Sequence, residues 1–310
     1  MVTPTPLHYV RNHFALPAPP GELVVDGAVR TPLRLALDDI RALRRRTLMV
    51  TLECAGNGRA FVKPPAPGEQ WNIGAVSNAE WAGASLHDVL ERAGPLASAV
   101  EVLFVGADQG TPKDLGRNIA FERSLPIADA LGADVLLAYE MNGAPLTPEH
   151  GAPLRLVVPG WYGMASVKWL SRIALIEAPF RGFYQHDRYV IEGRPLREIA
   201  PRAVITHPVD AAEVRAGRLD VRGYAWSGRD AITGVQVSRD GGAHWLDASL
   251  GAAPSRYAWR EWHLAIDAAP GELALLPRAL TRDGAQPLEP VWNALGYANN
   301  GARPVRIRVA

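Results

Sequence analysis

The chain has 310 residues, of which 48% are hydrophobic and 21% charged, the balance of a globular protein with one large domain or two ordinary ones. The formal net charge of +1 argues against a surface that binds nucleic acid, because such surfaces concentrate a basic excess. No segment is long and apolar enough to cross a membrane, and the start lacks the basic region and apolar core of an export signal. We therefore expect a cytoplasmic protein, or a periplasmic one if an export signal has been removed.

The first part of the chain alternates short apolar runs with helical signals. Its apolar and β-branched runs predict strands at residues 22–25, 47–54, 100–105, 135–140, 154–158 and 167–176. Short helices are expected at 37–43 and 85–92, the second with Ser85 as its N-cap and Gly94 as its stop. This mixture predicts an α+β fold with long functional loops, of which residues 59–75 form the clearest.

After Pro201 the pattern changes to strands alone. Strand-like runs separated by turn residues lie at residues 219–225, 232–238, 257–266, 274–281 and 305–309. Regular spacing of this kind over roughly 100 residues is typical of an immunoglobulin-like sandwich. The sequence therefore predicts two domains, a mixed α/β domain over residues 1–200 and an all-β domain over residues 201–310.

Cys54 is the only cysteine, so it cannot form an internal disulfide. One interpretation is a small buried hydrophobic residue, the usual role of a free cysteine. The other is a thiolate that acts as a nucleophile, a redox sensor or a soft metal ligand. The flanking residues favour the second, since Gly56 and Gly58 let the backbone approach a ligand and Arg59 places a positive charge near the thiol.

Cys54 also lies in one of several ordered segments that are spread over nearly the whole chain. They include Tyr-Val-Arg-Asn-His at residues 9–13 and Leu-Glu-Cys-Ala-Gly-Asn at 52–57, and the others are residues 71–83, 136–143, 150–160, 166–170, 223–228 and 238–245. Together they resemble the sulfite oxidase family of molybdopterin enzymes, in its haem-free form, a family that includes the molybdenum domain of plant nitrate reductase. The resemblance implies a molybdopterin-binding domain followed by a dimerisation sandwich, and hence a homodimer.

The resemblance also implies a cofactor and a set of site residues. Cys54 would bind molybdenum together with the two dithiolene sulfurs of one pyranopterin (Moco), which explains why no second cysteine is needed. The residues implied to hold the cofactor are Arg11, Asn12, His13, Cys54, Asp108, His150, Arg155, Ser166 and Lys168. Those implied to be catalytic are Cys54, Tyr189, Arg11, Arg59 and Trp71, and Tyr184 lies close enough in the sequence to compete with Tyr189.

Some of these residues have ordinary interpretations when the resemblance is set aside. His13 and His150 are then surface histidines, and Arg155 is a charge on an edge strand. Lys168 is different, because a lysine between Val167 and Trp169 in an apolar run needs a partner, for which a phosphate is suitable.

The implied reaction is oxygen-atom transfer between water and a small substrate, with the oxidation of sulfite to sulfate as the leading case. Arg11 and Arg59 would hold the oxyanion, and Tyr189 would donate a hydrogen bond at the reacting centre. No haem domain is recognised in the chain, so the electrons are expected to leave to a separate one-electron acceptor, such as a c-type cytochrome, or to dioxygen.

Leu295 departs from the family pattern, because vertebrate and plant sulfite oxidases have an arginine in the corresponding segment. At an effective dielectric constant near 20, one unit charge about 4 Å from a dianion contributes several kcal/mol. Leu295 therefore keeps open oxo transfer on a less anionic substrate, such as a sulfoxide or another S- or N-oxide. A separate alternative is a non-catalytic cofactor-binding protein, with the sandwich as its functional module.

Overall fold

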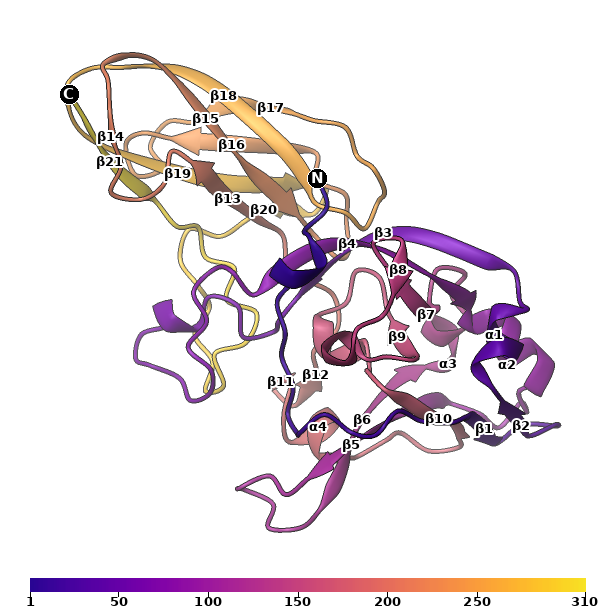
Figure 1. The fold of residues 1–310 in the computed structure, drawn as a ribbon. Coiled ribbons are helices and arrows are strands. Elements are labelled where there is room, and N and C mark those ends of the chain that lie inside the picture. The colour runs from indigo at the N-terminus through magenta and orange to yellow at the C-terminus, as the bar shows by residue number, and fades with distance from the viewer. The chain divides into compact units, whose positions relative to one another are not determined.

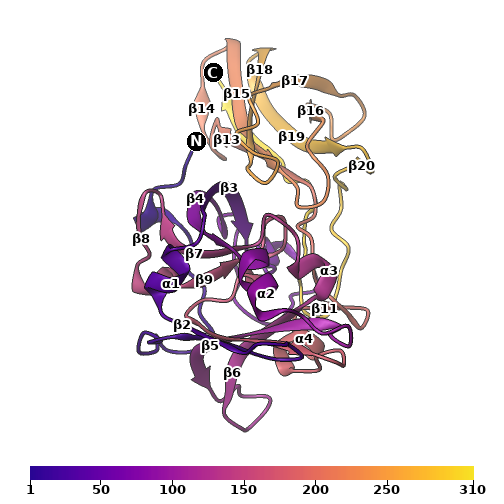
Figure 2. The ribbon, with the colours of Figure 1, turned by 90° about the vertical axis from the view of Figure 1, so that its right-hand side faces the viewer.

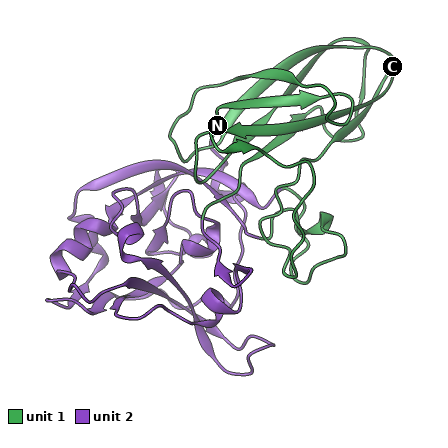
Figure 3. Ribbon diagram, turned by 180° about the vertical axis from the view of Figure 1, so that it is seen from behind, with its two compact units in different colours: residues 1, 56–73, 198–310 green, residues 2–55, 74–197 purple.

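The structure is a computed structural model that describes all 310 residues, and they divide into two compact units (Figure 3). The mixed unit comprises residues 2–55 and 74–197, and the sandwich unit comprises residue 1 with residues 56–73 and 198–310. The loop that follows Cys54 thus groups with the C-terminal strands and not with its neighbours in the sequence. No helix is long and apolar enough to span a membrane.

Two β-sheets form the framework of the mixed unit (Figures 1 and 2). The first sheet has the order β2 (Leu33–Leu35), β1 (Leu23–Gly27), β10 (Leu170–Ile176), β5 (Glu101–Gly110), β6 (Ile119–Pro126). The second has the order β3 (Arg45–Glu53), β4 (Val76–Ser85), β7 (Leu136–Met141), β8 (Ala144–Pro145), with β9 (Arg155–Val157) also paired to β7. All pairs are antiparallel except β1 with β10, and β11 (Val190–Ile191) forms a separate hairpin with β12 (Arg194–Pro195).

Short helices connect these strands. They are α1 (Leu37–Arg41), α2 (Leu86–Ala93), α3 (Ile127–Ala130) and α4 (Phe183–His186), with the 3₁₀ turns η1 (Thr5–Leu7), η3 (Pro148–His150) and η4 (Gly163–Ala165). The helix α2 buries every third or fourth side chain and ends at Gly94, whose φ of +66° confirms the predicted stop. Ser85 is the N-cap residue, as predicted, but its hydroxyl donates to the Ala133 carbonyl at 3.4 Å and makes no capping hydrogen bond to the helix.

The end of β3 that precedes Cys54 is buried and paired with β4. The last four residues of β3, from Val50 to Glu53, are all buried, and they pair in register with β4. The strand β4 is buried on both faces, with Trp81 fully enclosed. Cys54 therefore follows directly on a rigid, enclosed strand end.

The sandwich unit contains the remaining strands and the turn η2 (Arg59–Phe61). Its strand order is β13 (Arg202–His207), β15 (Gly217–Trp226), β18 (Arg260–Ala268), β17 (Leu246–Leu250), β16 (Gly234–Ser238), β19 (Gly271–Thr281), β21 (Val305–Val309), β14 (Glu213–Val214), with β20 (Gly284–Ala285) paired to β19. Alternate residues of β15 and β18 point into a core that includes Val221, Trp262 and Leu275. The predicted fold class, an α+β unit with an all-β immunoglobulin-like sandwich, is confirmed.

Candidate active site

A cavity that holds about 690 Å³ of space, counting the part open to solvent, lies in the mixed unit. It is lined by the N-terminal segment, the end of β3, parts of β5 and β6, and the segments that hold η3, η4 and Tyr189. All the predicted cofactor-binding residues line it, together with Tyr189: Arg11, Asn12, His13, Cys54, Asp108, His150, Arg155, Ser166 and Lys168. The structure thus brings together residues that are up to 178 positions apart in the sequence.

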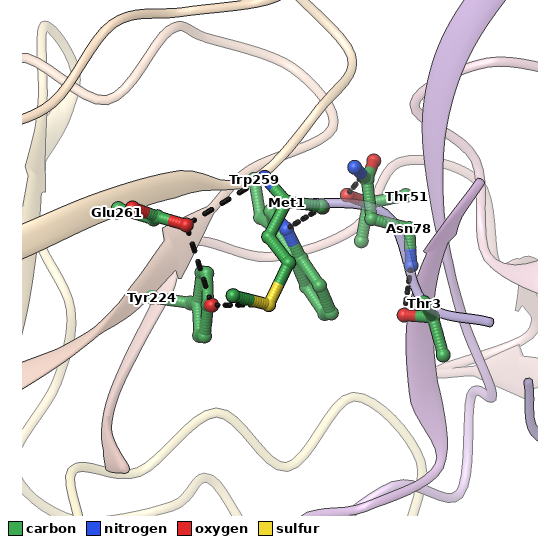
Figure 4. A network of polar contacts seen from close by, with 7 residues as sticks. All are labelled: Met1, Thr3, Thr51, Asn78, Tyr224, Trp259 and Glu261. Atoms are coloured by element: carbon green, nitrogen blue, oxygen red, sulfur yellow. Dashed lines mark hydrogen bonds and ion pairs between the residues drawn. The ribbon is translucent and has the colours of Figure 1, made fainter. Parts of the chain in front are cut away.

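Hydrogen bonds fix the N-terminal segment against β3 and β4. The Asn78 N–H donates to Thr3 Oγ1 at 3.2 Å, and Thr51 Oγ1 donates to Asn78 Oδ1 at 3.0 Å (Figure 4). Farther along, the Tyr9 N–H donates to Ser77 Oγ at 3.1 Å. Because Thr51 and Asn78 are buried cross-strand partners, this segment forms a firmly held wall of the cavity.

Cys54 is half-buried and lines the cavity at the end of β3. Its N–H donates to the Ala75 carbonyl at 2.9 Å, which extends the pairing of β3 with β4 by one residue. The chain contains no cluster of three or more histidine, cysteine or acidic side chains that could hold a metal. A metal bound to the Cys54 thiolate would therefore have to bring its other ligands with it.

Two cations, the buried Arg155 and the half-buried Lys168, dominate the electrostatics of the cavity. Arg155 donates to the carbonyls of His150 at 3.0 Å and Ser166 at 3.1 Å, and burial lowers its pKa to about 10. Lys168 donates to the Glu149 carbonyl at 2.8 Å and to Asn12 Oδ1, and burial, helped by Arg155, lowers its pKa to about 7. Neither forms an ion pair with a carboxylate, so both favour a bound anion.

The other titratable groups of the cavity add little charge of their own. Burial lowers the pKa of His8 and of His13 to about 3, so both rings are neutral at pH 7. Burial raises the pKa of Asp108 to about 6, so at pH 7 this carboxyl group is mostly ionised and offsets one positive charge. With Arg11 also in its lining, the cavity is net positive.

Tyr189 is buried, and its hydroxyl lies 2.6 Å from His13 Nε2. Tyr184 does not line the cavity, since its ring packs on the His13 ring with centroids 4.4 Å apart. Tyr189 has a φ of +56° and Trp169, also in the lining, has a φ of +48°. Bulky residues rarely adopt such angles, and those that do cluster at functional sites.

Arg59, Trp71 and Leu295 belong to the sandwich unit. Arg59 is buried and donates from Nε to the Leu295 carbonyl at 3.0 Å and from Nη1 to the Glu69 carbonyl at 2.9 Å. A Cβ atom added at Gly56 would lie 2.5 Å from Nη1, so a larger residue here would have to displace the guanidinium. The Arg59 guanidinium is therefore rigidly placed, with backbone carbonyls and not carboxylates as its partners.

His8 lines the cavity but is absent from the predicted site. A single histidine before the segment 9–13 forms no sequence motif. Only its contacts in the folded protein identify it as a residue of the site. Its ring is 5% exposed and lies between Tyr9, Trp81 and His150.

Both parts of the chain match the models of known protein families. The family described as oxidoreductase molybdopterin binding domain matches residues 15–184. The family described as Mo-co oxidoreductase dimerisation domain matches residues 194–310. These matches confirm the molybdopterin cofactor and the C-terminal dimerisation domain that the resemblance implies.

The similar proteins include two sulfite oxidases and a sulfane dehydrogenase. The chain is 36% identical over 343 residues to mitochondrial sulfite oxidase from Homo sapiens, covering 100% of this chain and 62% of the human protein. It is 39% identical over 330 residues to sulfite oxidase from Gallus gallus, covering 95% of this chain and 70% of that protein. The sulfane dehydrogenase SoxCD from Paracoccus pantotrophus has a similar structure, with a TM-score of 0.83 and 31% identity over 98% of this chain and 80% of that chain. The chain therefore belongs to the sulfite oxidase family of molybdopterin-dependent oxidoreductases.

Proposed function

We propose that this protein binds one molybdenum–pyranopterin cofactor in the cavity of the mixed unit and oxidises sulfite to sulfate by oxygen-atom transfer. The observation that carries the proposal is the lone thiol of Cys54 at the wall of a net positive cavity. When bound, the cofactor supplies the oxygen-atom transfer and takes up the two electrons.

The residues of the cavity suit this cofactor. Cys54 would hold the metal, for which the chain offers no other ligand cluster. The anionic part of the pterin would neutralise the buried Arg155 and the half-buried Lys168. The remaining residues proposed to hold the cofactor are Arg11, Asn12, His13, Asp108, His150 and Ser166.

The substrate roles rest on the cavity for some residues and on the family resemblance for others. Arg11 lines the cavity and would bind the oxyanion, and the Tyr189 hydroxyl would donate a hydrogen bond to it. His13 would fix the direction of that hydroxyl through its 2.6 Å contact. For Arg59 and Trp71 we propose substrate binding on the resemblance alone.

The acceptor and the assembly complete the proposal. Electrons would leave one at a time to a separate acceptor such as a c-type cytochrome, or to dioxygen. The match of residues 194–310 to a dimerisation domain supports a homodimer.

Leu295 favours a second candidate, oxo transfer on a sulfur substrate less anionic than sulfite. A leucine stands where the resemblance expects a substrate-binding cation, and the chain is similar to a protein named sulfane dehydrogenase. A non-catalytic cofactor-binding protein is disfavoured, since it would not need Cys54, Arg11 and Tyr189 in one cavity.

The test is steady-state turnover of the molybdenum-loaded protein with sulfite and with a neutral sulfoxide, using a soluble one-electron acceptor. We expect sulfite to be oxidised, and Arg11→Met to lower kcat/KM at least tenfold. Arg188→Met is the control, because Arg188 pairs with Asp114 and does not line the cavity. Loaded protein that is inactive on sulfite would refute sulfite oxidation, and activity on the sulfoxide would support the second candidate.

A further inference from the structure

His8 lines the cavity and holds a hydrogen-bond acceptor that no group of the protein uses. Its Nδ1 lies 3.0 Å from the Tyr9 carbonyl oxygen, which can only accept a hydrogen bond. The proton of the neutral ring is therefore on Nδ1, and Nε2 carries a bare lone pair. No group of the protein lies within hydrogen-bonding distance of this buried atom.

The surroundings of His8 hold the ring in this state. It stacks on Tyr9 at 5.3 Å between centroids and meets Trp81 edge-on at 5.8 Å and His150 edge-on at 5.0 Å. The charged groups that act on it are Arg155 and Lys168, and both oppose a second proton. His8 is therefore a neutral acceptor whose direction is fixed by packing.

His150 complements this arrangement with the opposite tautomer. Its Nε2 lies 3.3 Å from the Thr5 carbonyl oxygen, so Nε2 carries the proton and Nδ1 is the acceptor. Two neighbouring neutral histidines thus each fix one nitrogen on a backbone carbonyl and leave the other to accept. The cations of the cavity can bind only anions, whereas these nitrogens suit N–H donors.

We propose that His8 is a cofactor-binding residue, whose Nε2 accepts a hydrogen bond from an N–H or amino group of the bound pyranopterin. This inference rests on the proposed function, because it assumes that the cofactor occupies the cavity. A buried acceptor without a partner is rare in native proteins, and a heterocycle that carries N–H donors supplies the missing one. Arg155 and Lys168 would hold the anionic part of the cofactor while His8 selects its ring edge.

The test compares His8→Gln with His8→Met, two side chains of similar volume of which only glutamine can accept a hydrogen bond. Each variant and the wild type are loaded with the molybdenum cofactor, and the dissociating pterin is followed by its fluorescence after oxidation. We expect His8→Met to lose the pterin about tenfold faster than wild type and His8→Gln to stay within about twofold. The control is His87→Met, since His87 lies on α2 outside the cavity.

Equal pterin loss from the glutamine and methionine variants would overturn the inference. Pterin binding without turnover of sulfite would instead overturn only the proposed reaction.

Discussion

Lys168 shows how burial turns a single side chain into a ligand-dependent charge. Its ammonium group lies in the cavity with an amide and a carbonyl as partners, and burial lowers its pKa from 10.5 to about 7. In the cofactor-free protein the unfolded chain therefore binds a proton between pH 7 and 10.5 that the folded chain does not. A bound anion would raise this pKa again and keep the charge in place.

The first prediction concerns this proton. Between about pH 7 and 10.5 the Lys168 contribution to the free energy of unfolding should rise with pH, by up to about 1.4 kcal/mol per pH unit, because the unfolded state binds more protons. Lys168→Met should remove that part of the slope and stabilise the cofactor-free protein at pH 7. Urea unfolding of both proteins at pH 7 and 9.5 measures the difference, and parallel pH slopes would contradict the prediction.

The second prediction concerns Leu295, whose side chain is half-buried and whose carbonyl accepts from Arg59. Leu295→Arg keeps that backbone contact and adds the cation that the family pattern expects. We expect the KM for sulfite to fall at least tenfold, since one more charge near the dianion strengthens binding. Val291→Arg, at a position that is 79% exposed, is the control. A melting curve must accompany the kinetics because a buried, unpaired guanidinium would destabilise the fold, and an unchanged KM in a stable variant would refute the charge argument.

At the scale of elements, strands with strong local signals are predictable and strands made by their neighbours are not. The predicted strands near residues 23, 48, 137 and 172 are confirmed because they are rich in leucine, isoleucine and valine. By contrast, β4 contains alanine, glycine, serine and asparagine, and it is a strand because β3 and β7 pair with its two sides. The strand β6 is hidden in the same way by the charges of Glu122 and Arg123.

In the site, too, residues with a local sequence pattern can be predicted and residues defined by their spatial neighbours cannot. The cofactor residues can be predicted because they sit in segments with recognisable order, and the structure gathers them in one cavity. Lys168 was expected inside a strand, but β10 begins at Leu170, after the positive φ of Trp169. His8 could not be predicted, since its role depends on which atoms of its neighbours satisfy its ring.

The third prediction tests how β4 fits between its neighbours. A Cβ atom at Gly83 would lie 2.0 Å from the Leu137 carbonyl oxygen, next to the irregularity in the pairing of β4 with β7. Gly83→Ala should therefore destabilise the protein by about 2 kcal/mol or more, whereas Gly21→Ala, in open space, should change stability by less than about 0.5 kcal/mol. Chemical denaturation of both variants checks this, and equal effects would contradict the packing argument.

At the scale of the whole molecule, the two units differ in construction and in role. The mixed unit holds the cavity, and the sandwich unit holds the strands that match a dimerisation domain. The division of the chain at residue 201 stays a prediction. The chain spans 62% of the length of human sulfite oxidase. The electron acceptor and the full reaction are therefore proposals for this protein.

The central claim is that Cys54 binds molybdenum inside the cavity of the mixed unit, and it is tested most directly by X-ray absorption at the molybdenum edge. The loaded wild type should show three sulfur ligands, two from the pterin and one from Cys54. Cys54→Ser should show two, with the pterin retained by Arg155 and Lys168 and with the oxidation of sulfite abolished. An unchanged number of sulfur ligands in Cys54→Ser would contradict the account.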